Sequence, residues 1–152
     1  LLLTMLIRTL LCKPKEIDAG EYKAREFDKD VIAKHLSEAV QIPTVSMVGE
    51  FEGVDKPFRD YHAWLEKTYP LIHSTAQKTV INNYSLVYRF KGKNPELLPG
   101  AFLAHQDVVP APKEGWDYEP FGGTIDDGFI WGRGTQDMKG TMISLLEAME
   151  TM

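Results

Sequence analysis

The order of the expected secondary-structure elements predicts an α/β domain. Two stretches with apolar residues at helical spacing come first, and an alternating hairpin pattern follows them. A short, wholly apolar run, a long loop, a second hairpin and a final helix complete the order. Chains with this mixture usually pack helices against a sheet. The sequence reaches Met152 after few strands, so we expect the first part of such a domain, cut off partway through its sheet.

Each of the first two helices is predicted by an apolar stripe and a proline that ends it. Asp28 is the expected N-cap of the first helix, which stops before Pro43 because proline cannot continue a helix. The second helix ends at Pro70, and residues 45–56 between the two form an expected Gly-containing loop. His35 lies beside the first stripe and is given a structural role. The stripes are Val31, Ile32, Leu36, Ala39 and Val40, and then Phe58, Tyr61, Trp64 and Leu65.

Strand patterns follow the helices. Residues 76–81 and 84–90 alternate and are joined at Asn82-Asn83, which predicts a β-hairpin. Residues 101–104 are all apolar and are expected to form a buried central strand. Residues 124–131 form a second expected hairpin that turns at Asp126-Asp127-Gly128, where the spaced acids of a calcium loop are missing. Residues 141–152 form a predicted helix with Met142, Leu145, Leu146 and Met149 on its apolar face.

Composition limits the classes of partner. The chain has 152 residues, of which 43% are hydrophobic and 26% are charged, as in a soluble globular domain with a core. The formal net charge of -5, with no basic stripe, argues against a nucleic-acid partner. Cys12 is the single cysteine, so no disulfide can form within the chain.

Residues 1–12 form an apolar leader. The run is shorter than the roughly 20 residues that a membrane-spanning helix needs, so it fits the remnant of a membrane anchor or signal. The alternative is an amphipathic helix packed on the domain with Arg8 at the surface. Residues 13–27 are charged and contain Pro14 and Gly20, as expected of a linker, and residues 28–152 form the domain. The leader favours a membrane-anchored, secreted or lumenal location over a cytoplasmic one and leaves the orientation open.

Two loops carry groups suited to binding zinc. His105 and Asp107 close the apolar run 101–104, and Asp137 lies within Gly-Arg-Gly-Thr-Gln-Asp-Met-Lys-Gly at the mouth of the last helix. Imidazole nitrogen and carboxylate oxygen both bind zinc, at about 2.0–2.2 Å. Asp107 can face the same side as His105 and fix the imidazole tautomer. The alternatives are a surface histidine beside a solvated aspartate, and an aspartate favoured by a helix dipole.

The order of motifs through this region resembles a known family, the co-catalytic zinc amidohydrolases, which include aminoacylase, acetylornithine deacetylase, succinyl-diaminopimelate desuccinylase and carboxypeptidase S. The resemblance is strong over residues 103–150 and compatible over residues 27–90. The leader and the wording around His105 are most similar to the carboxypeptidase S branch. The matching motifs are Ala104-His105-Gln106-Asp107-Val108-Val109-Pro110, Gly115-Trp116, Pro120-Phe121, Asp127-Gly128, Trp131-Gly132-Arg133-Gly134 and Asp137-Met138-Lys139-Gly140.

The resemblance implies a role for each site residue. His105 would be a ligand of one zinc ion, Asp107 the catalytic-site aspartate that orients it, and Asp137 the carboxylate that bridges two zinc ions. The Asp137–Met138 peptide bond would be cis, and residues 132–134 would form a turn that positions the loop. The implied fold is the N-terminal part of a zinc-peptidase catalytic domain, a mixed sheet flanked by helices, truncated before a lid domain that often forms a homodimer.

The resemblance also implies an activity for the complete protein. It would hydrolyse amide or peptide bonds next to a free carboxylate, in a small peptide or an N-acyl amino acid, with two zinc ions. The family's adjacent glutamate pair, one of them the general base, lies outside the chain, and Glu147 and Glu150 do not match it. The fragment alone is therefore expected to be inactive. The alternatives are a deacylase of a biosynthetic N-acyl intermediate and a non-catalytic homologue that acts as a binding protein.

Overall fold

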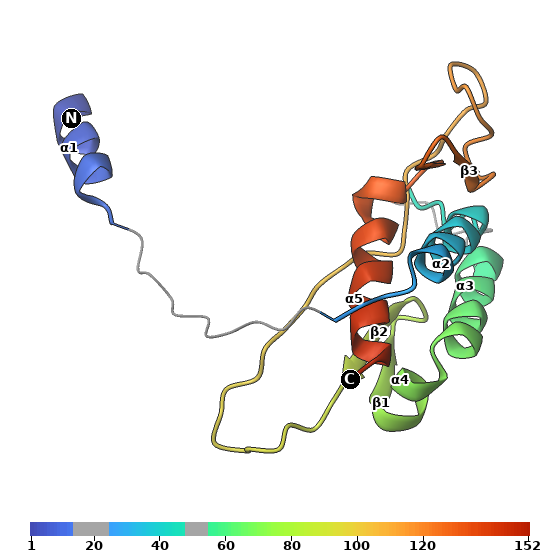
Figure 1. Cartoon of the computed structure of the whole chain (residues 1–152), viewed down its shortest axis with the longest axis horizontal. Coiled ribbons are helices and arrows are strands. Elements are labelled where there is room, and N and C mark those ends of the chain that lie inside the picture. Colours follow the sequence, from blue (N-terminus) through green and yellow to red (C-terminus); the bar gives the residue numbers. More distant parts are fainter. Residues whose placement is uncertain (14–24, 48–54) are drawn as a thin grey trace.

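A computed structural model describes residues 1–13, 25–47 and 55–152 (Figure 1). Within these ranges a short π-type segment, η1, leads directly into the last helix. The helices are α1 (Leu2–Leu11), α2 (Lys29–Gln41), α3 (Asp55–Thr68), α4 (Pro70–Thr75), η1 (Thr135–Gly140) and α5 (Thr141–Glu150). The strands are β1 (Gln77–Ile81), β2 (Ser85–Arg89), β3 (Thr124–Asp126) and β4 (Phe129–Trp131).

Helix α2 begins and ends where the sequence predicts. The Asp28 carboxylate accepts hydrogen bonds from the backbone N–H groups of Asp30 and Val31, which confirms it as the N-cap. The helix ends at Gln41, two residues before Pro43. Its inner face buries Ala39 and Val40, so the apolar stripe faces the core as expected.

Pro70 both ends α3 and begins α4. Proline is well suited to the first position of a helix, where its missing N–H would have no partner anyway. The Glu150 carboxylate of α5 accepts hydrogen bonds from the backbone N–H groups of Leu71 and Ile72 and so caps α4. The sequence analysis did not anticipate α4. It also placed Asp55 in the preceding loop, whereas α3 begins there; residues 48–54 of that loop lie outside the described ranges.

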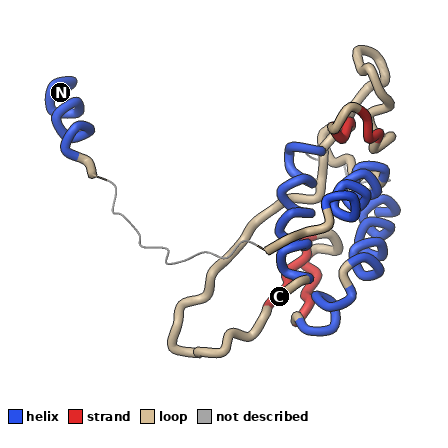
Figure 2. The backbone as a smooth tube through the Cα atoms, in the orientation of Figure 1, coloured by secondary structure: helices blue, strands red, loops and turns tan. Residues whose placement is uncertain are grey.

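The core lies where α2, α3, α4 and α5 pack together (Figures 1 and 2). Helix α5 turns Leu146 inward and packs Met142 and Met149 against the core, as predicted, and it also buries Ile143, which the predicted face did not include. His35 of α2 has its Nδ1 2.5 Å from Glu147 Oε1, and the Tyr69 hydroxyl donates to the same oxygen. His35 therefore has the structural role expected of it. The central buried side chains are Ala39, Tyr61, Leu65, Tyr69, Ile72, Ile143 and Leu146.

Both predicted hairpins are confirmed. β1 and β2 pair antiparallel, and Asn82 and Asn83 take positive φ values of 50° and 67° in the turn between them. β3 and β4 pair antiparallel around Asp127 and Gly128, which also have positive φ. Asparagine, aspartate and glycine tolerate this conformation best, which explains why the sequence signalled these turns.

The prediction of a buried strand at residues 101–104 is wrong. Within the described ranges no strand pairs with it, and Phe102 and Leu103 are 77% and 84% exposed. A central strand needs neighbours on both edges and a layer over its faces. The described residues instead form two separate two-stranded sheets and one parallel bridge, between Val45 and Val108. The α/β class holds, in a mostly helical form, but one mixed sheet is not present among these residues.

The apolar leader forms helix α1. None of its residues is buried, which gives no support to the alternative that it packs on the domain. Among the described residues, no helix has both the length and the apolar character needed to cross a membrane. Residues 14–24, most of the expected linker, lie outside the described ranges.

A matched pair of leucine substitutions tests the core. Leu65→Ala should lower the free energy of unfolding by about 2–5 kcal/mol, because Leu65 has no exposed surface and its truncation leaves a cavity. Leu71→Ala makes the same change at a side chain that is 58% exposed, and should cost less than about 0.5 kcal/mol. Urea denaturation followed by circular dichroism measures both. Equal losses would contradict the assigned core.

Candidate metal centre

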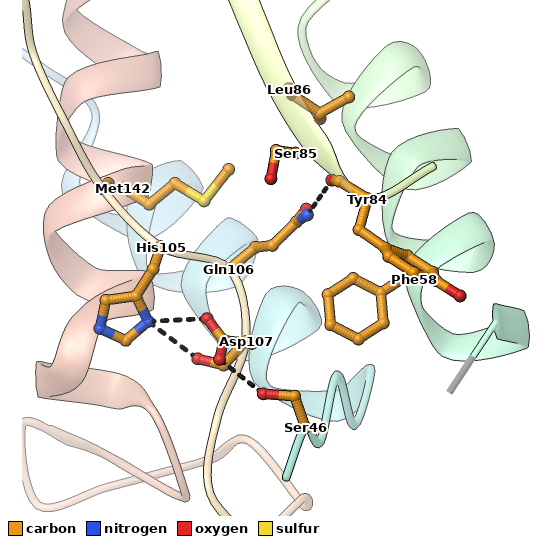
Figure 3. Close-up of a pocket in the computed structure, with 10 residues that line it drawn as sticks. Ser46, Phe58, Tyr84, Ser85, Leu86, His105, Gln106, Asp107 and Met142 are labelled. Carbon is orange, nitrogen blue, oxygen red and sulfur yellow. Dashed lines mark hydrogen bonds and ion pairs between the residues drawn. The ribbon is translucent and has the colours of Figure 1, made fainter. Parts of the chain in front are cut away.

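The three predicted site residues come together. The imidazole of His105 lies between the carboxylates of Asp137 and Asp107. On one side of the ring, its Nε2 is 2.9 Å from Asp137 Oδ1. On the other side of the ring, its Nδ1 is 3.0 Å from the backbone carbonyl oxygen of Asp107 and 3.3 Å from Asp107 Oδ1 (Figure 3). Asp137 follows His105 by 32 residues in the chain, so the fold and not local sequence makes this contact.

A short segment after α2 holds the His105 loop in place. The backbone N–H of Val108 donates to the carbonyl of Thr44, and the N–H of Ser46 donates to the carbonyl of Val108, at 2.9 and 3.0 Å. The Thr44 hydroxyl, fully buried, donates to the carbonyl of Gln106 at 2.5 Å. These bonds form the parallel bridge between the two segments and fix the backbone on both sides of Asp107.

Ser46 extends the chain of contacts that ends at the imidazole. Its hydroxyl donates to Asp107 Oδ2 at 2.6 Å, while Asp107 Oδ1 faces His105 (Figure 3). Both carboxylate oxygens of Asp107 are thus engaged, which restricts its rotation. The sequence analysis missed Ser46, because a serine in a loop some 60 residues away gives no local signal of this contact.

Gln106 points away from its two neighbours, as alternation along an extended segment requires. Its side-chain amide donates to the carbonyl of Tyr84 in the β1–β2 turn (Figure 3). Its Oε1 is 3.2 Å from His62 Nε2. Burial lowers the pKa of His62. Gln106 therefore attaches the site loop to the hairpin and leaves His105 and Asp107 facing the other way.

A pocket of about 290 Å³ opens beside these residues (Figure 3). Phe58, Leu86 and Met142 give it apolar walls, and His105 and Asp107 lie on its edge. The imidazole of His105 thus lines a partly apolar pocket. It also faces the exposed carboxylate of Asp137.

Glycine lets the second loop approach the first. Gly134 has φ of 91°, and a Cβ atom added to it would lie only 2.6 Å from Val108 Cγ1 in the His105 loop. The loop closes through a bond from the Lys139 N–H to the Gly134 carbonyl at 2.9 Å. Between these two residues lies Asp137, whose peptide bond to Met138 is cis, as the resemblance implied.

The turn at residues 132–134 has the structural role expected of it. The backbone N–H of Arg133 donates to the Pro120 carbonyl at 2.6 Å, and its guanidinium lies 5.0 Å from the centre of the Trp116 ring. These contacts fasten the start of the loop to the preceding Pro- and aromatic-rich segment.

The electrostatics favour a cation between the two loops. Partial burial lowers the pKa of His105, but its contacts with Asp137 and with the Asp107 carbonyl outweigh this, so the pKa is raised overall. The Asp137 side chain is 90% exposed and the His105 side chain 47% exposed, so both are open to an ion from solvent. An ionised carboxylate beside a solvent-accessible imidazole nitrogen is a pair of ligand groups that zinc accepts.

The donor atoms fit one zinc ion as part of a site. Two ligand atoms on a tetrahedral zinc, each bonded at about 2.0–2.2 Å, lie roughly 3.3–3.5 Å apart. The 2.9 Å contact between His105 Nε2 and Asp137 Oδ1 needs only a small opening to reach this spacing. Within the described ranges, no cluster of three or more His, Cys, Asp or Glu side chains could hold a metal ion.

Comparisons with known proteins identify the family of this chain. Residues 101–152 match the model of peptidase family M20/M25/M40. Carboxypeptidase S of Saccharomyces cerevisiae is 39% identical over 127 residues, which cover 77% of this chain and 22% of the yeast protein. The N-fatty-acyl-amino acid synthase/hydrolase PM20D1 of Homo sapiens is 40% identical over 119 residues, which cover 77% of this chain and 24% of the human protein.

A third relative, "Probable carboxypeptidase S-like 2" of Dictyostelium discoideum, is 39% identical over 124 residues, or 80% of this chain and 24% of that protein. The chain thus spans about a quarter of the length of the curated relatives it matches. It belongs to the M20/M25/M40 peptidase family, which confirms the resemblance seen in its motifs.

Two glycines with positive φ test how the loops meet. Gly134→Ala should destabilise the protein by about 1–3 kcal/mol and move Asp137 away from His105, because the new methyl group would overlap Val108. Gly128→Ala introduces the same methyl group at φ of 77° with nothing within 4 Å, so it isolates the backbone cost. Thermal unfolding and zinc affinity measure the difference. If both variants behave alike, the close approach at Gly134 is not what sets the loop spacing.

Proposed function

We propose that residues 28–152 are the N-terminal part of the catalytic domain of a dinuclear zinc hydrolase. In this proposal the complete enzyme cleaves an amide or peptide bond next to a free carboxylate, and its sheet continues through residues outside this chain. One observation carries the proposal: His105 is held by Asp107 on one ring nitrogen and faces Asp137 with the other. Membership of the M20/M25/M40 peptidase family supports the same chemistry.

Each residue has a distinct part in the proposed reaction. His105 would hold one zinc ion, and Asp137 would be shared between both ions. Asp107, held by Ser46, would keep the Nδ1 proton of His105 in place and so leave Nε2 free as a ligand. When bound, the metal pair would polarise the substrate carbonyl and lower the pKa of a bound water to near 7.

The general base and the remaining ligands would come from other parts of the complete protein. The two acidic side chains of α5 are not candidates, because both are already used. Glu147 contacts His35 and Tyr69, and Glu150 caps α4. The chain by itself is therefore proposed to be inactive.

The substrate class is proposed from the relatives. Two of them are named for the carboxypeptidase reaction and for hydrolysis of N-fatty-acyl amino acids. Both kinds of substrate carry an amide beside a free carboxylate, and we propose a small peptide or N-acyl amino acid for this protein. Deacylation of a biosynthetic N-acyl intermediate is the second candidate, within the same chemistry.

The apolar leader supports a proposed location. Helix α1 exposes leucines along its length, including Leu2, Leu10 and Leu11, and such a surface is costly to leave in water. We propose that residues 1–12 belong to a membrane anchor or signal, which would place the enzyme at a membrane or outside the cytoplasm. A homodimer through a lid domain is proposed for the complete protein on family resemblance alone.

His105→Ala in the protein made from its complete gene should lose one zinc ion and nearly all turnover, because it removes a ligand and leaves Asp137 without its partner. His73→Ala is the matched control, since the hydrogen bonds of His73 among the described residues go to the Tyr88 hydroxyl and the Tyr69 carbonyl, away from the site; this variant should retain both zinc and turnover. Zinc per chain is measured by plasma mass spectrometry, and hydrolysis with a panel of dipeptides and N-acyl amino acids. Chelation should abolish wild-type turnover, and added zinc should restore it.

Retained zinc and turnover in His105→Ala would overturn the metal assignment. A wild-type protein with the complete chain that binds zinc at no measurable affinity, and hydrolyses nothing in the panel, would instead support a non-catalytic binding protein.

Asp107→Ala should leave the fold intact and reduce zinc affinity or turnover by about 10–100-fold, because His105 loses the group that orients it. Asp117→Ala, at an exposed carboxylate in the same long loop, should match the wild type in both measurements. Isothermal titration with zinc and steady-state kinetics give the two values. If Asp107→Ala also matches the wild type, Asp107 is only a solvated neighbour of His105.

A further inference from the structure

Lys139 follows Asp137 by two residues, and its side chain has no exposed surface. Its Nζ donates to the carbonyl oxygens of Ala39 and Ile42, each at 2.7 Å. It also lies 4.8 Å from the centre of the Tyr61 ring of α3. Burying such a group is costly unless it is paired, so these contacts are what keep it inside.

The acceptors of Lys139 lie at the C-terminal end of α2: Ala39 is in its last turn, and Ile42 follows the helix as its C-cap. Carbonyls at this end form the negative end of the helix dipole. Each also accepts a backbone bond, Ala39 from the Ile42 N–H at 3.4 Å and Ile42 from the Thr44 N–H at 2.9 Å, so Lys139 adds a second, charge-compatible donor from a residue 97 positions further along the chain than Ile42. Burial lowers the pKa of Lys139 to about 7, yet the amine as well as the ammonium has enough N–H groups to satisfy both carbonyls.

The same end of α2 also controls the other loop. Two residues after Ile42 the chain reaches Thr44, which bonds to the backbone of Gln106 and Val108 on either side of Asp107. Hydrogen bonds of Lys139 tie the Asp137 loop to this end of α2, and hydrogen bonds of Thr44 tie the His105 loop to it. The C-terminal end of α2 is therefore a common reference for both proposed ligands.

We propose that Lys139 is a positioning residue that sets the separation of Asp137 from His105 by tying the Asp137 loop to the C-terminal end of α2. This inference rests on the proposed function, because the separation matters only if the two residues share a metal. The printed side-chain contacts of Lys139 go to Ala39, Ile42 and Tyr61, so its effect on Asp137 passes through the backbone of Met138, the one residue between them.

The test compares Lys139→Met with Lys34→Met in the protein made from its complete gene. Methionine has a similar length and no donor, so the loop loses its tether while most of the volume remains. Lys34 lies on the exposed side of α2 and pairs with Glu38, so its substitution controls for removing a lysine from this region. Zinc affinity by titration, kcat, KM and the unfolding midpoint are measured for each.

Lys139→Met should weaken zinc affinity about 10-fold or more and lower kcat by a similar factor, with KM nearly unchanged, and saturating zinc should restore part of kcat. Lys34→Met should match the wild type. A Lys139→Met protein that is less stable, yet keeps wild-type zinc affinity and kcat per folded molecule, would overturn the proposal and leave Lys139 a purely structural residue.

Two further arms keep the result decisive. If Lys139→Met does not fold, Lys139→Arg replaces it, since arginine keeps donors but has a wider head group. Reduced zinc affinity in folded Lys139→Arg supports the proposal, and unchanged affinity overturns it. A wild-type protein without zinc or turnover contradicts the proposed function itself, whereas a zinc-loaded wild type with an unaffected Lys139 variant contradicts only the positioning role.

Discussion

The C-terminal end of α2 is the point on which the rest of the candidate site depends. The Ala39 and Ile42 carbonyls at this end accept hydrogen bonds from Lys139 Nζ. The segment that follows Pro43 pairs with the loop of His105. Two loops more than 30 residues apart are thereby fastened to one helix end. A metal centre needs ligand atoms placed to within a few tenths of an ångström, and rigid helices provide such placement better than free loops.

The helical core explains why this helix end is itself fixed. Ala39 and Val40 are fully buried in the last turn of α2, and Ala39 packs in a cluster in which Tyr61, Leu65 and Ile143 have almost no exposed surface. Close-packed side chains leave little room for α2 to shift. The site residues above it remain open, with the Asp137 side chain 90% exposed. A packed base beneath an open pair of ligands suits a centre that further residues complete.

Local chemistry made much of this fold predictable. Asp28 caps α2, and the asparagine pair at residues 82–83 and Asp127-Gly128 turn the hairpins, because each conformation depends on the residue type itself. His105, Asp107 and Asp137 were named from short motifs, and they do lie together. Their use as metal ligands stays a prediction.

Features that depend on distant partners were missed or wrong. Ser46 and Lys139 gain their roles from contacts with residues 61 and about 100 positions away, which no local pattern records. Helix α4 depends on the cap supplied by Glu150. The expected strand at residues 101–104 failed for the same reason, since an apolar run becomes a central strand only when neighbouring strands pair with it. Exposed Phe102 and Leu103 show that the described residues do not supply them.

The most direct test of the account is a crystal structure of the complete protein grown with zinc, with anomalous data collected at the zinc edge. The account predicts an anomalous peak bonded to both His105 Nε2 and an Asp137 oxygen, at about 2.0–2.2 Å, with Asp107 still on the opposite side of the imidazole. Zinc held elsewhere, with His105 and Asp137 still hydrogen-bonded directly to each other, would contradict it.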